Sequence, residues 1–418
     1  MAWYTKLENP KAYLLGFLKW LILGGLLGAV GGLLGTFFHW VLEEVGVLRT
    51  AQPILIYFLP VVGLVIVGFY KLTGMDKTRG TNEMIDAVNE KRDINPLLVP
   101  AIFIATALTH LFGGSAGREG AALQLGGTLG SIVGRLLHLS PEDRQVMILS
   151  GMSAVFAALF GTPLTAALFS VEFIAVGNFF GPGFLPSLVA AFTASRIALA
   201  FGATPTAFAL EKTQPLSVAG IAQTAVLAVL VALVSMAFCF VMHKTEQKLA
   251  KWLPNPFIRI FVGGCAVVLL TIILRTHDYN GAGMDVVARA ILQGQALPWA
   301  FALKIIFTAI TLGSGYKGGE IVPTFFVGAT FGCAVAPLLG MDPGIAAALG
   351  MVGMFCCVTN SPFTSIIMGI EIFGGAHLLP FAIMCAIGFV LSGNSGLYAS
   401  QRIVYSKIAP EIVNRHAS

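Results

Sequence analysis

Long apolar stretches follow one another along almost the whole chain, separated by short polar or glycine- and proline-rich breaks. They span residues 13–40, 51–73, 97–112, 121–138, 145–160, 163–177, 183–202, 216–241, 256–274, 297–312, 321–339, 344–358, 362–374 and 377–392. Many are shorter than the roughly 17–25 residues that a helix needs to cross a bilayer. Short, interrupted helices are tolerated at membrane depth only where they line a cavity inside the protein. The pattern therefore predicts an all-α, polytopic membrane protein with discontinuous helices, of transporter or channel type.

The composition agrees with a membrane protein and excludes several other classes. The chain is 56% hydrophobic and 11% charged, against about 25% charged in an average soluble domain. The first stretch is too long for a signal-peptide core, so we expect a retained helix. The net charge of +5 is modest, and most Lys and Arg residues lie at stretch ends, where membrane topology requires them. Nucleic-acid binding therefore has no support.

The six cysteines all lie inside apolar stretches, and their spacing matches no zinc or iron–sulfur pattern. We expect them to be small buried hydrophobic residues. The sequence thus predicts no metal site and no cofactor.

An internal repeat divides the chain into two halves. Pro163–Glu172 parallels Pro362–Glu371, with proline, threonine and glutamate recurring 199 residues apart (163 to 362, 172 to 371). Two further matches are the glycines at 117, 126 and 130 with those at 319, 328 and 332, and residues 80–84 with 281–284. Repeat-built transporters hold their site between the halves near the bilayer midplane. We predict transmembrane halves at 1–205 and 206–418, the second with a short tail, and we expect them to be inverted.

An arginine–glutamate pair stands among small residues in the run Gly113–Gly120. Arg118 and Glu119 are ionisable groups at membrane depth, and such groups are costly and mark ion or proton paths. The run that follows, 121–130, indicates a helix start, whose free N–H groups and dipole favour an anion. The segment therefore predicts an anion site together with a carboxylate that competes for it.

Four motifs resemble those of the CLC family of chloride channels and proton-coupled anion antiporters. Gly117–Gly120 resembles the family's GREGP motif, and residues 315–323 resemble its GxxGGxFxP motif. Gly161–Glu172 is similar to the segment after the gating helix, and Tyr398 matches the pore tyrosine. The resemblance covers nearly the whole chain. It implies anion transport by a homodimer with one pore in each subunit.

Three departures from the common pattern are similar to the fluoride-exporting branch of the family. Ala121 stands where proline follows GREG, and Glu320 follows Gly318-Gly319 where ordinary members have an apolar residue. The loop Gly80–Met84 lacks the usual pore serine. The resemblance therefore implies exchange of fluoride, with chloride as the alternative anion, for protons across the cytoplasmic (inner) membrane.

Two details of that branch stay open in this chain. The branch is described with a methionine in the pore-serine place, whereas Thr81 is the better alignment here and Met84 lies three residues on. A threonine is frequent two residues after the GGE glutamate, and here that residue is Val322. The residue that fills the pore-serine place is thus undecided by sequence.

Glu119 and Glu320 are the predicted gating and proton-transfer groups. Ionised, Glu119 occupies the anion path as a tethered anion; protonated, it leaves that path and carries the proton. Through the resemblance, Glu320 stands in for the internal proton-transfer glutamate of chloride antiporters, which aligns near Phe173, a residue that cannot titrate. The predicted anion-binding residues are Gly80, Thr81, Asn82, Arg118, Gly120, Ile321 and Tyr398.

The expected donors come from side chains and backbone together. We expect Arg118 to hydrogen-bond backbone carbonyls near the site and to add a positive field. The backbone N–H groups of Glu320 and Ile321 would complete the cage, and Tyr398 would donate its hydroxyl. For Glu172 and Glu371, a role in transport and a structural role at helix ends both stay open.

Several other functions stay open at this point. A chloride/proton antiporter or a passive chloride channel would use the same motifs, and carboxylates also bind Na⁺, as a cation-coupled transporter requires. An intramembrane enzyme would need a GxSxG serine paired with a base, an HExxH pair or paired intramembrane aspartates. We identify none of these, and we expect no enzymatic activity.

Overall fold

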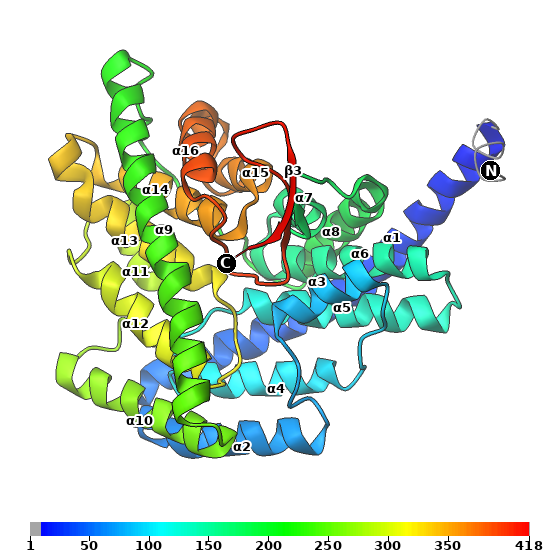
Figure 1. The fold of residues 1–418 in the computed structure, drawn as a ribbon, viewed down its shortest axis with the longest axis horizontal. Coiled ribbons are helices and arrows are strands. Elements are labelled where there is room, and N and C mark those ends of the chain that lie inside the picture. Colours follow the sequence, from blue (N-terminus) through cyan, green and yellow to red (C-terminus); the bar gives the residue numbers. More distant parts are fainter. Residues whose placement is uncertain (1–9, 418) are drawn as a thin grey trace.

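Sixteen helices build the part of the chain that the structure describes, residues 10–417 of this computed structural model (Figure 1). The first eight are α1 Pro10–Ala51, α2 Leu59–Leu72, α3 Thr81–Glu90, α4 Leu98–Leu111, α5 Glu119–Leu136, α6 Pro141–Phe160, α7 Pro163–Glu172 and α8 Gly181–Ala200. The last eight are α9 Val218–Trp252, α10 Pro256–Leu274, α11 Met284–Leu292, α12 Ala300–Gly313, α13 Ile321–Leu339, α14 Pro343–Thr359, α15 Pro362–Phe373 and α16 Leu378–Leu391. Two 3₁₀ segments, η2 Pro53–Phe58 and η3 Gly375–His377, precede α2 and α16.

The predicted polytopic, helical architecture is confirmed. Among the described residues, seven helical stretches are long and apolar enough to cross a membrane, and five shorter apolar stretches accompany them. Predicted stretches 256–274 and 321–339 coincide with α10 and α13. The N-terminal ends of α1 and α9, the two longest helices, project from the body of the bundle (Figure 1). The predicted boundary at 205 falls in the non-helical segment 201–217, and residues 1–9 of the predicted first half lie outside the described part. Division of the chain there stays a prediction.

Reciprocal contacts relate the two halves. The Gly117 N–H donates to the Gly319 carbonyl and the Gly319 N–H donates to the Gly117 carbonyl, both at 2.7 Å. Such an exchange, in which each segment makes the same contact to the other, is what a two-fold axis produces. The expected inverted relation of the halves accounts for it, because a two-fold axis in the membrane plane turns one half over.

The same reciprocity appears at α7 and α15, which lie side by side near the centre of the bundle (Figure 1). Glu172, the last residue of α7, accepts hydrogen bonds from Phe363 N (3.1 Å) and Thr364 N (2.7 Å) at the start of α15. In return, Glu371 near the end of α15 accepts from the first-turn N–H groups of α7, Leu164 (3.0 Å) and Thr165 (2.8 Å). Each glutamate therefore caps the helix that carries the other. These contacts support a structural role for both residues.

The repeated glycines mark close helix crossings. A Cβ on Gly126 of α5 would collide with the backbone of Gly151 on α6, and one on Gly328 of α13 would collide with Gly350 on α14. Only glycine allows backbones to approach so closely. The matching glycines of the two halves thus reflect the same close helix packing, which occurs once between α5 and α6 and again between α13 and α14.

Two elements and a small sheet were not expected. Helices α3 and α11 are short and carry polar residues, so they escape a search for long apolar stretches. The chain after α16 forms strands β2 Arg402–Tyr405 and β3 Ile412–His416, and β2 pairs in parallel with β1 Ala175–Val176 after α7. The predicted tail is therefore part of the fold.

Candidate functional site

The site lies where two helix starts meet. The antiparallel contact between Gly117 and Gly319 brings together the loops that precede α5 and α13. Glu119 is the first residue of α5 and Ile321 is the first residue of α13. Helix N-termini carry unpaired N–H donors and a partial positive charge. The two halves therefore contribute two anion-attracting ends to one place.

Glu119 lies fully buried across the start of the opposite helix. Its Oε2 accepts hydrogen bonds from Arg118 N at 3.0 Å and from Val322 N at 3.2 Å. Oε2 also lies close to Gly117, so that a Cβ there would push the carboxylate away from this position. The carboxylate therefore sits where a free anion would bind the α13 N-terminus.

The other oxygen of Glu119 is unpaired. Oε1 is buried and has no hydrogen-bond partner among residues 10–417. Leaving a buried charged oxygen without a donor is costly, and such groups take up a proton or an ion. Oε2 is thus held by two backbone N–H groups, whereas Oε1 is available to take up a proton.

Glu320 is the second carboxylate of the site and precedes α13. Its Oε2 is also buried without a hydrogen-bond partner in the described part of the chain, and its carboxyl interacts electrostatically with Glu119. It lines a cavity of about 320 Å³ together with Gly80, Asn82, Lys317 and Gly318. Arg79, an exposed residue, lines the same cavity. Glu320 therefore stands between Glu119 and a cavity that reaches the surface.

Tyr398 closes the site from the segment after α16. Its side chain is 1% exposed and its hydroxyl has no partner among the described residues. The ring makes an edge contact with Phe173, 5.7 Å between centroids, and Phe173 stacks on Phe169 at 4.5 Å. Phe173, where the resemblance would place a proton-transfer glutamate, is thus part of a dry aromatic wall. The unpaired hydroxyl is the one donor that Tyr398 offers to a ligand.

The loop before α3 packs against the same helix starts. Thr81 begins α3, and its Oγ1 lies next to Gly120, the second residue of α5. Gly80 has φ +61°, a conformation that favours glycine. Asn82 lines the cavity, but its Oδ1 accepts from Ser400 N at 2.9 Å. Asn82 therefore anchors the segment that carries Tyr398 through its amide oxygen, and its expected role as an anion donor through the amide N–H₂ group stays a prediction.

Thr81 rather than Met84 lies next to the site. Met84 is fully buried and packs its sulfur against Gly127, further along α5. These positions favour Thr81, or the preceding Gly80, which lines the cavity, for the pore-serine place that the sequence left open.

Arg118 makes a contact that the sequence did not indicate. Its Nη1 lies 3.2 Å from Nδ1 of His39 on α1, and its guanidinium lies over the Phe160 ring at 6.0 Å. Within the described part, this bond takes the place of the expected bonds to backbone carbonyls. Arg118 and Glu320 also occupy matching positions of the repeat, each directly before a helix start.

Two participants escaped the sequence reasoning. Val322 contributes only its N–H, so its side chain gives no signal, and the sequence had suggested Glu320 and Ile321 as donors instead. His39 lies 79 residues from Arg118 in a continuous apolar helix. An ionisable residue in such a helix is the signal that would have singled it out.

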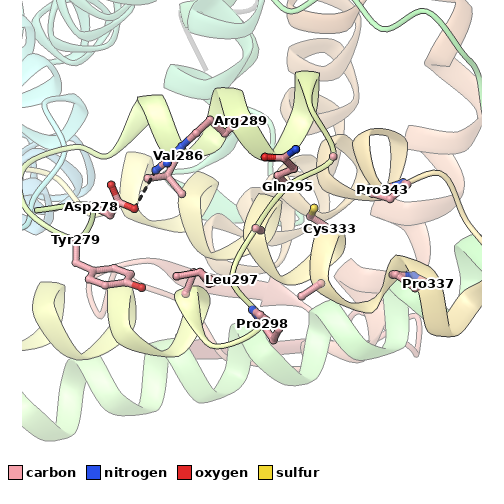
Figure 2. Close-up of a pocket in the computed structure, with 14 residues that line it drawn as sticks. Asp278, Tyr279, Val286, Arg289, Gln295, Leu297, Pro298, Cys333, Pro337 and Pro343 are labelled. Carbon is pink, nitrogen blue, oxygen red and sulfur yellow. Dashed lines mark hydrogen bonds and ion pairs between the residues drawn. The ribbon is translucent and has the colours of Figure 1, made fainter. Parts of the chain in front are cut away.

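A larger cavity of about 630 Å³ lies elsewhere, between α11, α12 and α13 (Figure 2). The labelled charges there, Asp278 and Arg289, pair with each other at 2.9 Å, as Figure 2 shows. Its other lining residues are mostly apolar. Because its charges satisfy one another, we place the functional site at the helix starts instead.

Comparison with known proteins agrees with the geometry. The family described as "Voltage gated chloride channel" matches residues 63–393. A "Chloride/fluoride channel protein" of Pseudomonas syringae pv. tomato is 34% identical, covering 93% of this chain and 87% of that protein. The "H(+)/Cl(-) exchange transporter ClcA" of Vibrio cholerae is 23% identical, covering 89% and 85%.

Solved structures are similar as well. A CLC-type fluoride/proton antiporter has a TM-score of 0.89 at 32% identity, covering 92% of this chain and 98% of that one. A slow cyanobacterial Cl⁻/H⁺ antiporter has a TM-score of 0.76 at 19% identity, covering 89% and 94%, and shows the shared fold.

Proposed function

The chain belongs to the voltage gated chloride channel family, or CLC family, and from this premise we propose that it exports fluoride in exchange for protons. The family consists of transporters and channels, not enzymes. The similarity to a fluoride/proton antiporter of solved structure supports fluoride. The observation that carries the proposal is the pair of buried, unpartnered carboxylate oxygens on Glu119 and Glu320.

Proton exchange follows from the two orphan oxygens. Oε1 of Glu119 and Oε2 of Glu320 accept no hydrogen bond from the described residues, so each is free to take up a proton. Glu320 lines the cavity and is close enough to Glu119 for the two carboxyls to interact electrostatically, so in this proposal Glu320 takes up a proton from the cavity and passes it to Glu119. A carboxyl group that is protonated no longer accepts strongly from Val322 N and leaves the α13 start.

Anion movement uses the place that Glu119 vacates. Val322 N–H, the Tyr398 hydroxyl and the dipoles of α5 and α13 then offer donors to a small anion. Fluoride is strongly hydrated, so replacing its water needs several strong donors in one place. Return of the ionised Glu119 displaces the anion. The Glu119 carboxylate therefore carries the proton and also exchanges places with the anion, which couples the two movements.

We further propose the cellular setting. The chain is a multi-pass membrane protein, and its bacterial relatives point to the cytoplasmic membrane. Exposed apolar residues on the outer helices suit lipid contact and a homodimer with one pore in each subunit. Fluoride resistance is the expected benefit to the cell.

The test is a flux measurement with purified protein in liposomes. We expect fluoride to leave loaded vesicles while protons enter, and chloride to leave far more slowly under the same gradient. Chloride efflux as fast as fluoride efflux would refute the fluoride assignment and favour the chloride/proton alternative. Fluoride efflux without proton uptake would make the protein a channel.

A further inference from the structure

A row of polar side chains leads from the surface to Arg118 along one turn of α1. Glu43 has a side chain that is 63% exposed, and its Oε2 lies 3.5 Å from Nε2 of His39. His39 has a side chain that is 7% exposed, and its Nδ1 lies 3.2 Å from Nη1 of Arg118. Arg118 precedes Glu119 and interacts with its carboxylate. An exposed acid is thus connected to the gating glutamate through a histidine and an arginine.

The bond to Arg118 fixes the chemical state of His39. A guanidinium has five N–H donors and no acceptor, so Nδ1 of His39 must be the acceptor. The ring proton of the neutral imidazole therefore sits on Nε2, which faces Glu43. Protonation of His39 places a second N–H on Nδ1. The bond from Arg118 is then lost, and two positive groups face each other.

The other ionisable groups around α1 do not replace this pair. His39 interacts electrostatically with Arg118 and Glu43. The helices packed against α1 carry a few other ionisable groups. They are Glu119 and Arg135 of α5, His110 of α4, exposed Arg196 of α8, exposed Tyr57 of η2, and Glu142, Asp143 and Arg144 at the start of α6. His110 interacts with Arg118 as well, and Arg118 is therefore the common neighbour of both histidines.

The repeat places this row on the side of the membrane opposite the Glu320 cavity. Arg118 and Glu320 occupy matching positions of two halves related by a two-fold axis. Such an axis in the membrane plane sends equivalent positions towards opposite faces. The Glu320 cavity and the Glu43–His39 row are therefore exposed to the aqueous solutions on opposite sides of the membrane.

We propose that His39 is a positioning residue that holds Arg118 away from Glu119 and releases it when the solution on the Glu43 side becomes acidic. Released from His39 and attracted by the Glu119 carboxylate, the guanidinium pairs with Glu119 and keeps it at the α13 start. Acid acting through His39 therefore slows anion movement and opposes the effect of protonating Glu119 itself. The inference rests on the proposed gating role of Glu119.

The experiment compares anion efflux from proteoliposomes at roughly pH 7.5 and pH 4.5 and at steps between them, a range wide enough for a buried histidine. His39→Gln keeps an acceptor for Arg118 but cannot titrate. We expect it to match the wild type at the higher pH and to exceed it by about tenfold or more at the lower pH, the size expected for losing a charge-assisted hydrogen bond. An unchanged pH profile in His39→Gln would overturn the proposal.

Two further variants keep the test decisive. His39→Leu removes the acceptor, so its efflux should be slow at both pH values; efflux as fast as the wild type's overturns the proposal. Glu43→Gln removes the charge that favours the imidazolium, so the pH dependence of efflux in this variant should have its inflection at a lower pH than in the wild type. An inflection at the same pH contradicts the role of Glu43. Thermal unfolding in detergent checks that each variant is folded.

Failure here is distinguishable from failure of the proposed function. The pH profile is measured as total efflux of whichever anion the protein carries. The identity of that anion and the accompanying proton uptake are read from the same vesicles. A chloride carrier, or a carrier without proton coupling, would refute the proposed function and still reveal whether His39 sets the pH profile.

Discussion

Two pairs of glutamates lie against helix starts in this protein, and their oxygens are treated differently. In the capping pair, Glu172 and Glu371, both oxygens of each carboxylate accept hydrogen bonds from the first turn of the opposite helix. In the gating pair, Glu119 and Glu320, each carboxylate keeps one buried oxygen without a partner among the described residues. A satisfied carboxylate resists protonation and movement, whereas an unsatisfied one invites both. The same residue type, near the same kind of helix end, thus caps helices in one pair and is proposed to serve transport in the other.

The largest effect should come from removing the charge of Glu119. We expect Glu119→Gln to abolish proton uptake during anion efflux, because an amide cannot carry the proton. The measurement is proton uptake by proteoliposomes during fluoride efflux. Glu371→Gln is the matched control: it keeps an acceptor for α7 and should keep proton uptake. Normal proton uptake in Glu119→Gln would remove the distinction between the two pairs.

Glu320→Gln should weaken transport without removing it fully. In the proposed mechanism Glu320 takes up protons from the cavity, and loss of a positioned acid or base typically costs about a hundredfold in rate. We expect proton-coupled fluoride efflux to fall by about that factor, while the protein stays folded because Oε2 has no partner to lose. A variant with unaltered coupled flux would show that protons reach Glu119 by another route.

The sequence predicted the framework well and the site only in part. Apolar runs such as 256–274 and 321–339 predicted α10 and α13, because a helix at membrane depth must be apolar both towards lipid, as in α10, and towards the protein interior, as in α13. The short helix α3 escaped because it is polar: Asn82 bonds to the C-terminal segment, and Glu83 and Asp86 pair with an arginine. Glu119 was identified as a charge out of place.

Contacts between the halves were beyond sequence reasoning. Val322 N meets Glu119 across 203 positions, and a backbone donor leaves no mark in a side-chain pattern. The bond between His39 and Arg118 likewise depends on how α1 packs, which no local pattern encodes. The C-terminal strands arise only because β1 offers them an edge. The features that the sequence did not predict are therefore contacts between segments that lie far apart in the chain.

Removing a capping glutamate should cost stability and spare the mechanism. Glu172→Ala leaves two backbone donors and the Thr364 hydroxyl without their acceptor. At about 1–3 kcal/mol for each buried group that loses its partner, we expect the free energy of unfolding to fall by about 3 kcal/mol or more. Denaturation in detergent measures it. The ratio of protons to fluoride in the folded protein should not change, and a changed ratio would give Glu172 a part in transport.

The smallest effect should come from the hydroxyl in each cap. Thr364 donates to Glu172 at 2.5 Å and Thr165 donates to Glu371 at 2.6 Å. Thr364→Val and Thr165→Val keep the shape and remove one bond, so each should lower the free energy of unfolding by about 1 kcal/mol. Thr330→Val is the control, because that hydroxyl bonds only to carbonyls of its own helix. If the two caps act independently, the double variant should show the sum of the single effects. A double variant that loses markedly more than the sum would mean that the caps form one cooperative unit across the two halves.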